Sequence, residues 1–175
     1  MSTAYAETEP FEINGFSITQ TVTVPGTPMD AFNTFTGDIK PWWDHSMSEN
    51  PDVLRIDPYA GGQFYEKMSN GQGTVEHARV IFAMPGKLLR LHGPFGLSGL
   101  AVDMVSTITF APVSADGEEV QPGASGDVTS DSTRVTVEGH IVGQIDTELA
   151  EIVDGVWHHF LTDRLKPYME GTLEN

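Results

Sequence analysis

The feature that most constrains the fold is a periodic apolar pattern toward the C-terminal end of the chain. Its members recur at spacings of one, three or four residues: Leu149, Ile152, Val153, Val156, Trp157, Phe160, Leu161, Leu165 and Tyr168. This period of about 3.6 residues predicts one long helix with a wide apolar face. Asp146 is a suitable N-cap, with Glu148 in the first turn. Pro167 is expected to kink or end the helix near Asp163 and Arg164.

The chain before this helix has the alternating apolar and polar residues of half-buried strands. The segments with this pattern are 16–24, 53–56, 63–68, 74–84, 87–92, 101–111 and 133–142. Asn70-Gly71 is a hairpin signal between the third and fourth of them. Thr27 as N-cap and Pro28 at the first helical position predict a short helix after the first strand. A second short helical or irregular piece is expected over 39–43.

This order predicts an α+β fold in which a curved antiparallel sheet of about six to seven strands surrounds the C-terminal helix. A single helix does not cover the whole apolar face of such a sheet, so we expect an apolar cavity between them. The expected domain covers 16–171, after a flexible lead-in at 1–15. The acidic, turn-rich stretch 114–131 is expected to be a flexible hairpin insertion.

Charge and composition exclude several classes of function. The chain has 25 acidic and nine basic residues and a net charge of −16, which disfavours binding to nucleic acid or to an anionic membrane. No apolar run is long enough to insert into a bilayer. The absence of cysteine excludes disulfides, thiol catalysis and thiolate metal sites. The first residues lack the features of a signal peptide, so a cytoplasmic location is expected.

A set of short motifs follows the same order as in a known superfamily. They are Pro25 and Phe32 after the first strand, Trp42-Trp43, Gly61-Gly62-Gln63-Phe64, Gly73-Thr-Val75 with Pro85-Gly86-Lys87-Leu88, and Gly155-Val-Trp157 with Leu165-Lys166 and Tyr168-Met169-Glu170. Over 16–171 they resemble the START-like (SRPBCC) superfamily, and within it the branch named after the activator of the heat-shock protein 90 ATPase.

The resemblance implies a helix-grip fold and three kinds of role. The first is binding of a hydrophobic or amphipathic molecule, such as a lipid or a polyketide-like compound, in the cavity. The second is cyclase- or dehydratase-like catalysis, with a cavity glutamate as the acid–base group. The third is a stress-related, co-chaperone-like interaction with a chaperone or a second copy of the chain. We expect the binding role, with no cofactor and no catalytic residue assigned.

Twelve residues are candidates for contact with the ligand. The apolar ones are Phe32, Trp43, Phe64, Phe82, Phe95, Val105, Val153, Trp157 and Phe160, and the polar ones are Glu66, Glu76 and Arg164. Apolar burial would supply the affinity and the polar groups the orientation. Phe95 belongs to the glycine-rich stretch 93–99, which is interpreted as a mobile loop over the cavity with Phe95 and Leu97 as gate residues.

The two glutamates lie on strands that are expected to pair. If the apolar faces of 63–68 and 74–84 coincide, Glu66 lies opposite Glu76, and one carboxyl pKa is raised because the charges are close. A bulge or a register shift of one residue would instead send one glutamate to solvent. Arg164 lies in the apolar stripe of the helix, as a counter-ion to Glu66 or Glu76, as a clamp for an acidic ligand, or with its charged end reaching solvent.

Asp44-His45 is a further polar pair, directly after Trp42-Trp43. It fits half of an acid–base pair or of a metal site, although the further ligands that a metal needs are not evident from the sequence. His158 and His159 are expected on a solvated helix face. His77 is expected at a surface or strand edge, and no metal site is predicted.

Overall fold

The computed structural model describes residues 10–114 and 131–174, and its main element is one eight-stranded antiparallel sheet. The spatial order of the strands is β1-β8-β7-β6-β5-β4-β3-β2. Their bounds are β1 Asn14–Pro25, β2 Gly37–Asp38, β3 Val53–Ile56, β4 Gln63–Lys67, β5 Thr74–Met84, β6 Leu88–His92, β7 Val102–Val113 and β8 Ser132–Gly143. Seven of these match the seven strands predicted from the sequence, and β2 adds a two-residue edge strand.

One helix follows β1, and the remaining helical run follows β8. They are α1 (Pro28–Phe35), α2 (Thr147–His158), a π-helical segment η3 (His159–Leu165) and α3 (Lys166–Glu170), with 3-10 turns η1 (Ser69–Gly71) and η2 (Phe95–Leu97). Thr27 and Asp30 cap α1 reciprocally, and the Asp146 carboxylate accepts a hydrogen bond from Leu149 N–H at the start of α2. Both caps confirm the predictions from the sequence. Each satisfies backbone N–H groups that the first turn of a helix leaves without partners.

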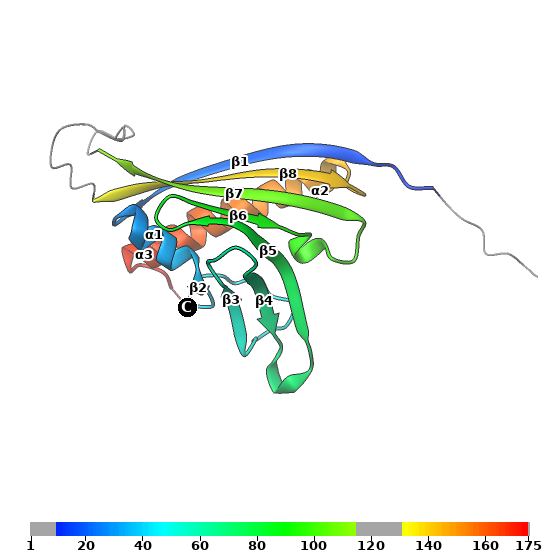
Figure 1. The fold of residues 1–175 in the computed structure, drawn as a ribbon, viewed down its shortest axis with the longest axis horizontal. Coiled ribbons are helices and arrows are strands. Elements are labelled where there is room, and N and C mark those ends of the chain that lie inside the picture. Colours follow the sequence, from blue (N-terminus) through cyan, green and yellow to red (C-terminus); the bar gives the residue numbers. More distant parts are fainter. Residues whose placement is uncertain (1–9, 115–130, 175) are drawn as a thin grey trace, which may run out of the picture.

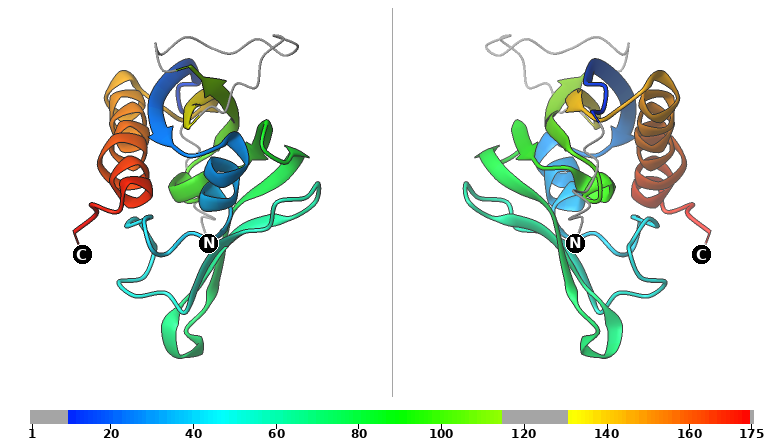
Figure 2. Two further views of the ribbon diagram at one scale, coloured as in Figure 1. Left: turned by 90° about the vertical axis from the view of Figure 1, so that its left-hand side faces the viewer. Right: turned by 90° about the vertical axis from the view of Figure 1, so that its right-hand side faces the viewer.

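The sheet curves around the C-terminal helix (Figures 1 and 2), as the α+β prediction requires. The run α2–η3–α3 lies along the inner side of the sheet, and α1 packs against β7 and β8. The predicted helix-grip architecture is confirmed. No helix among the described residues is long and apolar enough to cross a membrane.

Pro167 changes the C-terminal helix in a different way from the one predicted. The helix does not end near Asp163; it passes through the π-helical segment η3 and continues to Glu170. Proline clashes with the carbonyl four residues before it in an α-helix. In the wider π turn the N–H of Lys166 bonds instead to the carbonyl of Leu161, five residues back. The helix therefore absorbs the proline by widening.

A bulge between β4 and β5 reverses the expected positions of two side chains. Phe64 pairs with Ala78, but Tyr65 pairs with Glu76, so that His77 is an extra residue on β5. His77 and Ala78 are both buried, whereas Glu76 is exposed. The pairing of Glu66 with Glu76 is thus wrong, and the alternative with a bulge is correct.

A second bulge lies between β5 and β6. Val80 pairs with Leu91, and Phe82 rather than Ile81 pairs with Arg90. Phe82, which the alternation placed on the inner face with Val80, is therefore 43% exposed. Its expected place in the ligand site is wrong, because the bulge shifts the alternation by one residue.

The predicted insertion and lead-in fall partly on residues that the structure does not describe. Of 114–131, the stretch 115–130 lies outside the described residues, and β7 and β8 remain paired up to Val113 and Ser132. Of the lead-in, 1–9 lies outside the described residues. Its last two residues, Asn14 and Gly15, already belong to β1.

One end of the space between sheet and helix is filled with aromatic side chains. Phe32 and Phe35 of α1 pack on Phe110 of β7 with ring centroids 5.4 and 6.0 Å apart, and Trp42 lies 5.5 Å from Phe35. The indole N–H of Trp42 donates to the carbonyl of Thr34 at 2.9 Å, which satisfies its polar atom in the core. Phe32, expected near the ligand, therefore belongs to the packed core.

Candidate functional site

The other end of this space contains a cavity of about 280 Å³. Its wall is almost entirely apolar: Trp43, His45, Ser46, Met47, Phe64, His77, Phe95, Gly96, Leu97, Met104, Ile152, Val153, Val156, Trp157 and Phe160. Trp43 stacks on Phe160 with centroids 3.7 Å apart, and it packs on Trp42 of the filled end with centroids 5.4 Å apart. An aromatic wall with few polar groups is typical of a small-molecule site.

The turn η2 closes one side of the cavity. It follows Gly93, whose φ of +155° and close approach to β5 exclude a side chain, since a Cβ there would lie 2.7 Å from the Cα of Ala78. Phe95 reaches from this turn to within 5.9 Å of Phe64 and 5.8 Å of Trp157, measured between ring centroids. The structure therefore places Phe95 and Leu97 in the cavity wall.

Six of the twelve predicted ligand residues line the cavity. They are Trp43, Phe64, Phe95, Val153, Trp157 and Phe160. Val105 does not, because Met104 is the residue of this pair on β7 that is buried against the interior. Glu76 is exposed and bound by Arg79 and Gln63 outside the cavity.

Glu66 is fully buried behind the cavity wall. One carboxylate oxygen accepts from Ser48 Oγ at 2.6 Å and Ser48 N–H at 2.9 Å, and the other accepts from Met47 N–H at 2.8 Å. Burial by itself would raise the pKa of the Glu66 carboxyl. These hydrogen bonds and the nearby His77 outweigh that effect and hold its pKa below the ordinary value. Glu66 is therefore ionised at neutral pH.

His77 lies between Glu66 and the cavity. Its Nε2 is 3.4 Å from Glu66 Oε2, and its side chain is 7% exposed. This Nε2 makes no hydrogen bond with any residue that the structure describes. Burial lowers the pKa of His77, and the attraction of Glu66 offsets this only in part. The cavity wall thus contains a neutral imidazole with a polar atom left unsatisfied, beside a buried anion.

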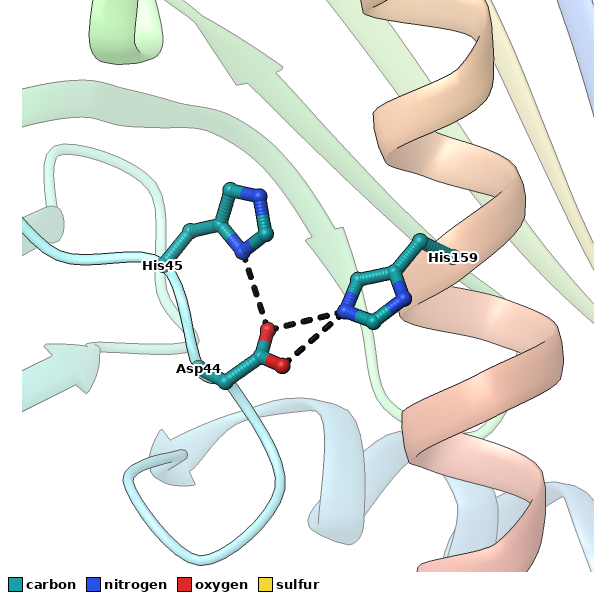
Figure 3. Close-up of side chains that lie close together, drawn as sticks. All are labelled: Asp44, His45 and His159. Carbon is teal, nitrogen blue, oxygen red and sulfur yellow. Dashed lines mark hydrogen bonds and ion pairs between the residues drawn. The ribbon is translucent and has the colours of Figure 1, made fainter.

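A polar cluster lies at the edge of the cavity (Figure 3). The Asp44 carboxylate is 2.9 Å from His45 Nδ1 and 2.9 Å from His159 Nε2. Arg164 Nε donates to the carbonyl of Trp42 at 3.0 Å and lies 3.3 Å from Asp44 Oδ2. Arg164 is therefore no counter-ion to Glu66 or Glu76, because it pairs with Asp44 instead.

The opposite charges of this cluster stabilise each other and shift the pKa values of Asp44 and His159 in opposite directions. Partial burial would raise the pKa of Asp44, but hydrogen bonds with His45 and His159, and the charge of Arg164, hold it below its usual value. Partial burial likewise opposes protonation of His159, but its bonds with Asp44 and Asp163 raise its pKa overall. His158 is exposed as predicted, and the His159 side chain is 32% exposed. The contact that the prediction lacked is the one between His159 and Asp44, across 115 positions of sequence.

Sequence reasoning missed His77 because the bulge turns it inward. An undisturbed alternation with Ala78 on the inner face places His77 outside, and a bulge residue has no signature of its own in that pattern. His159 is next to Phe160, at the border of the apolar stripe, and this position is the one sign in the sequence that it is partly buried. Its partner Asp44 is identified only once the segment with Asp44 and His45 packs against the helix.

The comparisons with known proteins show the fold. No family model and no curated protein matches the chain. A solved structure of an uncharacterised protein from Rhizobium leguminosarum is 12% identical, with a TM-score of 0.56 over 93% of this chain and 99% of that one. The solution structure of the Aha1 dimer from Colwellia psychrerythraea is 16% identical, with a TM-score of 0.54 over 91% and 99%. CalU16 from Micromonospora echinospora is 14% identical, with a TM-score of 0.50 over 93% and 89%.

Proposed function

We propose that this chain binds a small amphipathic molecule in the cavity between the C-terminal helix and the sheet. The observation that supports this most directly is the unsatisfied Nε2 of His77 in an otherwise apolar wall. A buried polar atom without a partner costs about 1–3 kcal/mol, and a ligand that supplies the partner recovers that cost. The expected ligand is therefore an apolar molecule that carries one hydrogen-bonding group.

The size of the cavity limits the apolar body. An apolar cavity of roughly 150 Å³ holds a benzene molecule. The volume of about 280 Å³ fits a body of about two fused rings or a short aliphatic chain. Its aromatic wall, with Trp43, Phe64 and Trp157, favours a flat ring system.

The charge of Glu66 selects among the hydrogen-bonding groups. Its carboxylate lies 3.4 Å from His77 Nε2, so an anionic group bound there would face a buried anion. A hydroxyl avoids this repulsion and is able to donate to the lone pair of Nε2. We therefore expect neutral alcohols or phenols to bind more tightly than carboxylates of the same shape.

Three matched probes test this function: naphthol, naphthoate and naphthalene, titrated by calorimetry. Naphthol should bind more tightly than naphthalene, and naphthoate most weakly. His77→Phe should reduce naphthol affinity by about tenfold and leave naphthalene affinity unchanged, because one hydrogen bond contributes about 0.5–1.5 kcal/mol.

Val156→Trp, which fills the cavity, should abolish binding of all three probes, while the exposed-site control Val142→Trp should not. Equal affinities for naphthol and naphthoate would contradict the proposed selectivity.

The pair of Glu66 and His77 also favours a second function, acid–base catalysis on the bound molecule. A neutral imidazole beside an ionised carboxylate is able to accept a proton from an acidic group of a ligand. The observation that favours it is that His77 lies in the cavity wall with Glu66 directly behind it. The test is turnover of a two-ring β-hydroxy ketone followed by absorbance. In the dehydration of this ketone, His77 takes the α-proton as the double bond forms and returns it to the departing hydroxyl, which leaves as water. The reaction should disappear in His77→Phe and Glu66→Gln.

The co-chaperone-like role remains a hypothesis without a structural observation of its own. The Colwellia protein of similar fold is a dimer, and a second copy of this chain is the corresponding partner. Sedimentation of the purified chain over a range of concentrations decides between monomer and dimer.

A further inference from the structure

Asp44, His45 and His159 bring three metal-binding side chains together at the edge of the cavity. Asp44 and His45 follow Trp43 in the segment between β2 and β3, and His159 is the first residue of η3. Figure 3 shows the His45 ring and the His159 ring on two sides of the Asp44 carboxylate, each with a nitrogen toward it. Two imidazoles and one carboxylate are a ligand set for first-row divalent ions, whereas magnesium and calcium prefer oxygen alone.

The distances are close to those that a bound ion requires. His45 Nδ1 lies 2.9 Å from Asp44 Oδ1, and His159 Nε2 lies 2.9 and 3.1 Å from the two carboxylate oxygens. Bonds of 2.0–2.1 Å at tetrahedral angles separate neighbouring ligand atoms by about 3.3 Å. One candidate atom from each side chain lies within 4.8 Å of the others. The His45 side chain is 52% exposed, and its ring centroid lies 5.4 Å from that of His159.

His159 also has the partner that metal-bound histidines usually have. Its second nitrogen, Nδ1, lies 3.2 Å from the carboxylate of Asp163. A carboxylate that accepts from one ring nitrogen fixes the tautomer and directs the other nitrogen to the metal. Asp163 is on η3 with His159, and the widening of the helix there is of the kind that often marks functional sites.

The charges around the three side chains suit a divalent cation. Asp44 and Asp163 supply two negative charges next to the site, and Arg164, 3.3 Å from Asp44, offsets one of them. The chain as a whole has a net charge of −16, which attracts cations from solution. Arg164 is held by its bond to the carbonyl of Trp42, and it approaches Asp44 Oδ2, the oxygen that His159 also contacts.

We propose that Asp44, His45 and His159 form a binding site for a first-row divalent transition-metal ion, such as zinc. Asp163 is the positioning residue of the site. Three protein ligands leave at least one coordination position open. Because His45 also belongs to the cavity wall, this position lies at the edge of the cavity, where water or a donor group of a small molecule completes the coordination. The site stands on its own geometry and does not depend on the ligand proposed for the cavity.

The test is titration of the purified, tag-free chain with zinc by calorimetry and with cobalt by visible absorption, in a buffer that keeps the imidazoles neutral. We expect one ion per chain and intense cobalt bands of a four-coordinate site with nitrogen and oxygen ligands. His45→Asn, His159→Asn and Asp44→Asn should each weaken zinc binding by at least tenfold. Asp163→Asn should weaken it by about tenfold, as loss of a second carboxylate partner does.

Two matched controls separate this site from scattered surface histidines. His158→Asn changes the neighbour of His159, and His140→Asn changes an exposed histidine of β8; neither should alter zinc affinity. The absence of cobalt bands in the unaltered chain, or equal effects of the control and site variants, would overturn the proposal. The naphthol titration, repeated with a chelator, separates the two proposals, because cavity binding should persist when the metal is removed.

Discussion

The two ends of the space between sheet and helix have walls of the same kind of side chain but are packed differently. At one end, Phe32 and Phe35 of α1 pack edge-on against Phe110, and all three rings are buried. At the other end, Phe95 of η2 and the helix residue Trp157 contact each other edge to face, and both line a cavity of about 280 Å³. Since both ends are aromatic, composition alone does not tell a stabilising core from a binding site.

The difference arises from what each connection contributes to the interior. The β1–β2 connection contains α1, which places a row of large side chains under the helix end. The β6–β7 connection contains only the short turn η2, which covers the cavity without filling it. Trp42 and Trp43 mark the boundary: the first has 0% exposure and belongs to the filled end, and the second is part of the cavity wall.

The sharpest test of this comparison is removal of one aromatic ring from each end. Phe35→Ala should lower the free energy of unfolding by about 3–5 kcal/mol, because it leaves a hole in a packed core. Phe95→Ala should cost far less, about 1 kcal/mol, because its ring already borders empty space. Urea unfolding of both variants measures the two values. Equal losses would mean that the two ends are packed alike.

The two glutamates give the next largest contrast. Glu66→Gln should cost about 2–3 kcal/mol, because the three hydrogen bonds to the buried carboxylate lose their charge and one amide N–H would face a donor. Glu76→Gln, on the exposed side of the same hairpin, should change stability by less than about 0.5 kcal/mol. Thermal unfolding of both variants is the measurement. A cost at Glu76 that matches Glu66 would contradict the bulge.

His77 gives the smallest effect, and it depends on pH. Its pKa is lowered in the folded chain, so the unfolded chain takes up a proton first as the pH falls below about 6.5. Stability due to the neutral ring is therefore complete above that pH and is lost as the pH falls toward the folded pKa. The loss is at most about 1.4 kcal/mol per pH unit. Over the range from 7 to 5, His77→Phe should show a flatter profile in urea unfolding than the unaltered chain. Parallel profiles would contradict this origin.

Local patterns predicted the elements of the fold, but not every side-chain direction. The residues 53–56 and 74–84 form strands with the bounds that alternation gave, and Thr27 and Asp146 cap their helices as expected. The alternating pattern gives correct side-chain directions only where the strand has no bulge. The two bulges of β5 therefore made the predicted directions of His77 and Phe82 wrong. Each of these errors is a shift of one residue, which is enough to exchange the two faces of a strand.

The candidate site was predicted in part for a related reason. Val153, Trp157 and Phe160 were recognised from the helical stripe, and Phe64 from the inner face of a strand. Trp43 was recognised as an aromatic residue of the piece 39–43, and Phe95 as a residue of the glycine-rich loop 93–99. The cavity itself depends on how much volume the connections fill, which no local pattern contains. The association of His159 with Asp44 depends on the packing of two segments that are 115 residues apart in sequence. The distance of 2.9 Å between His159 Nε2 and Asp44 Oδ2 is known only from the folded chain.

The placement of the indole rings has a spectroscopic consequence. The chain has three tryptophans, and Trp43 and Trp157 line the cavity while Trp42 lies 5.4 Å from Trp43 between ring centroids. Trp157 in turn lies 6.0 Å from Trp43, so the three chromophores form one connected group. Intrinsic emission from this group is a label-free reporter of whether the space beside it is empty or occupied.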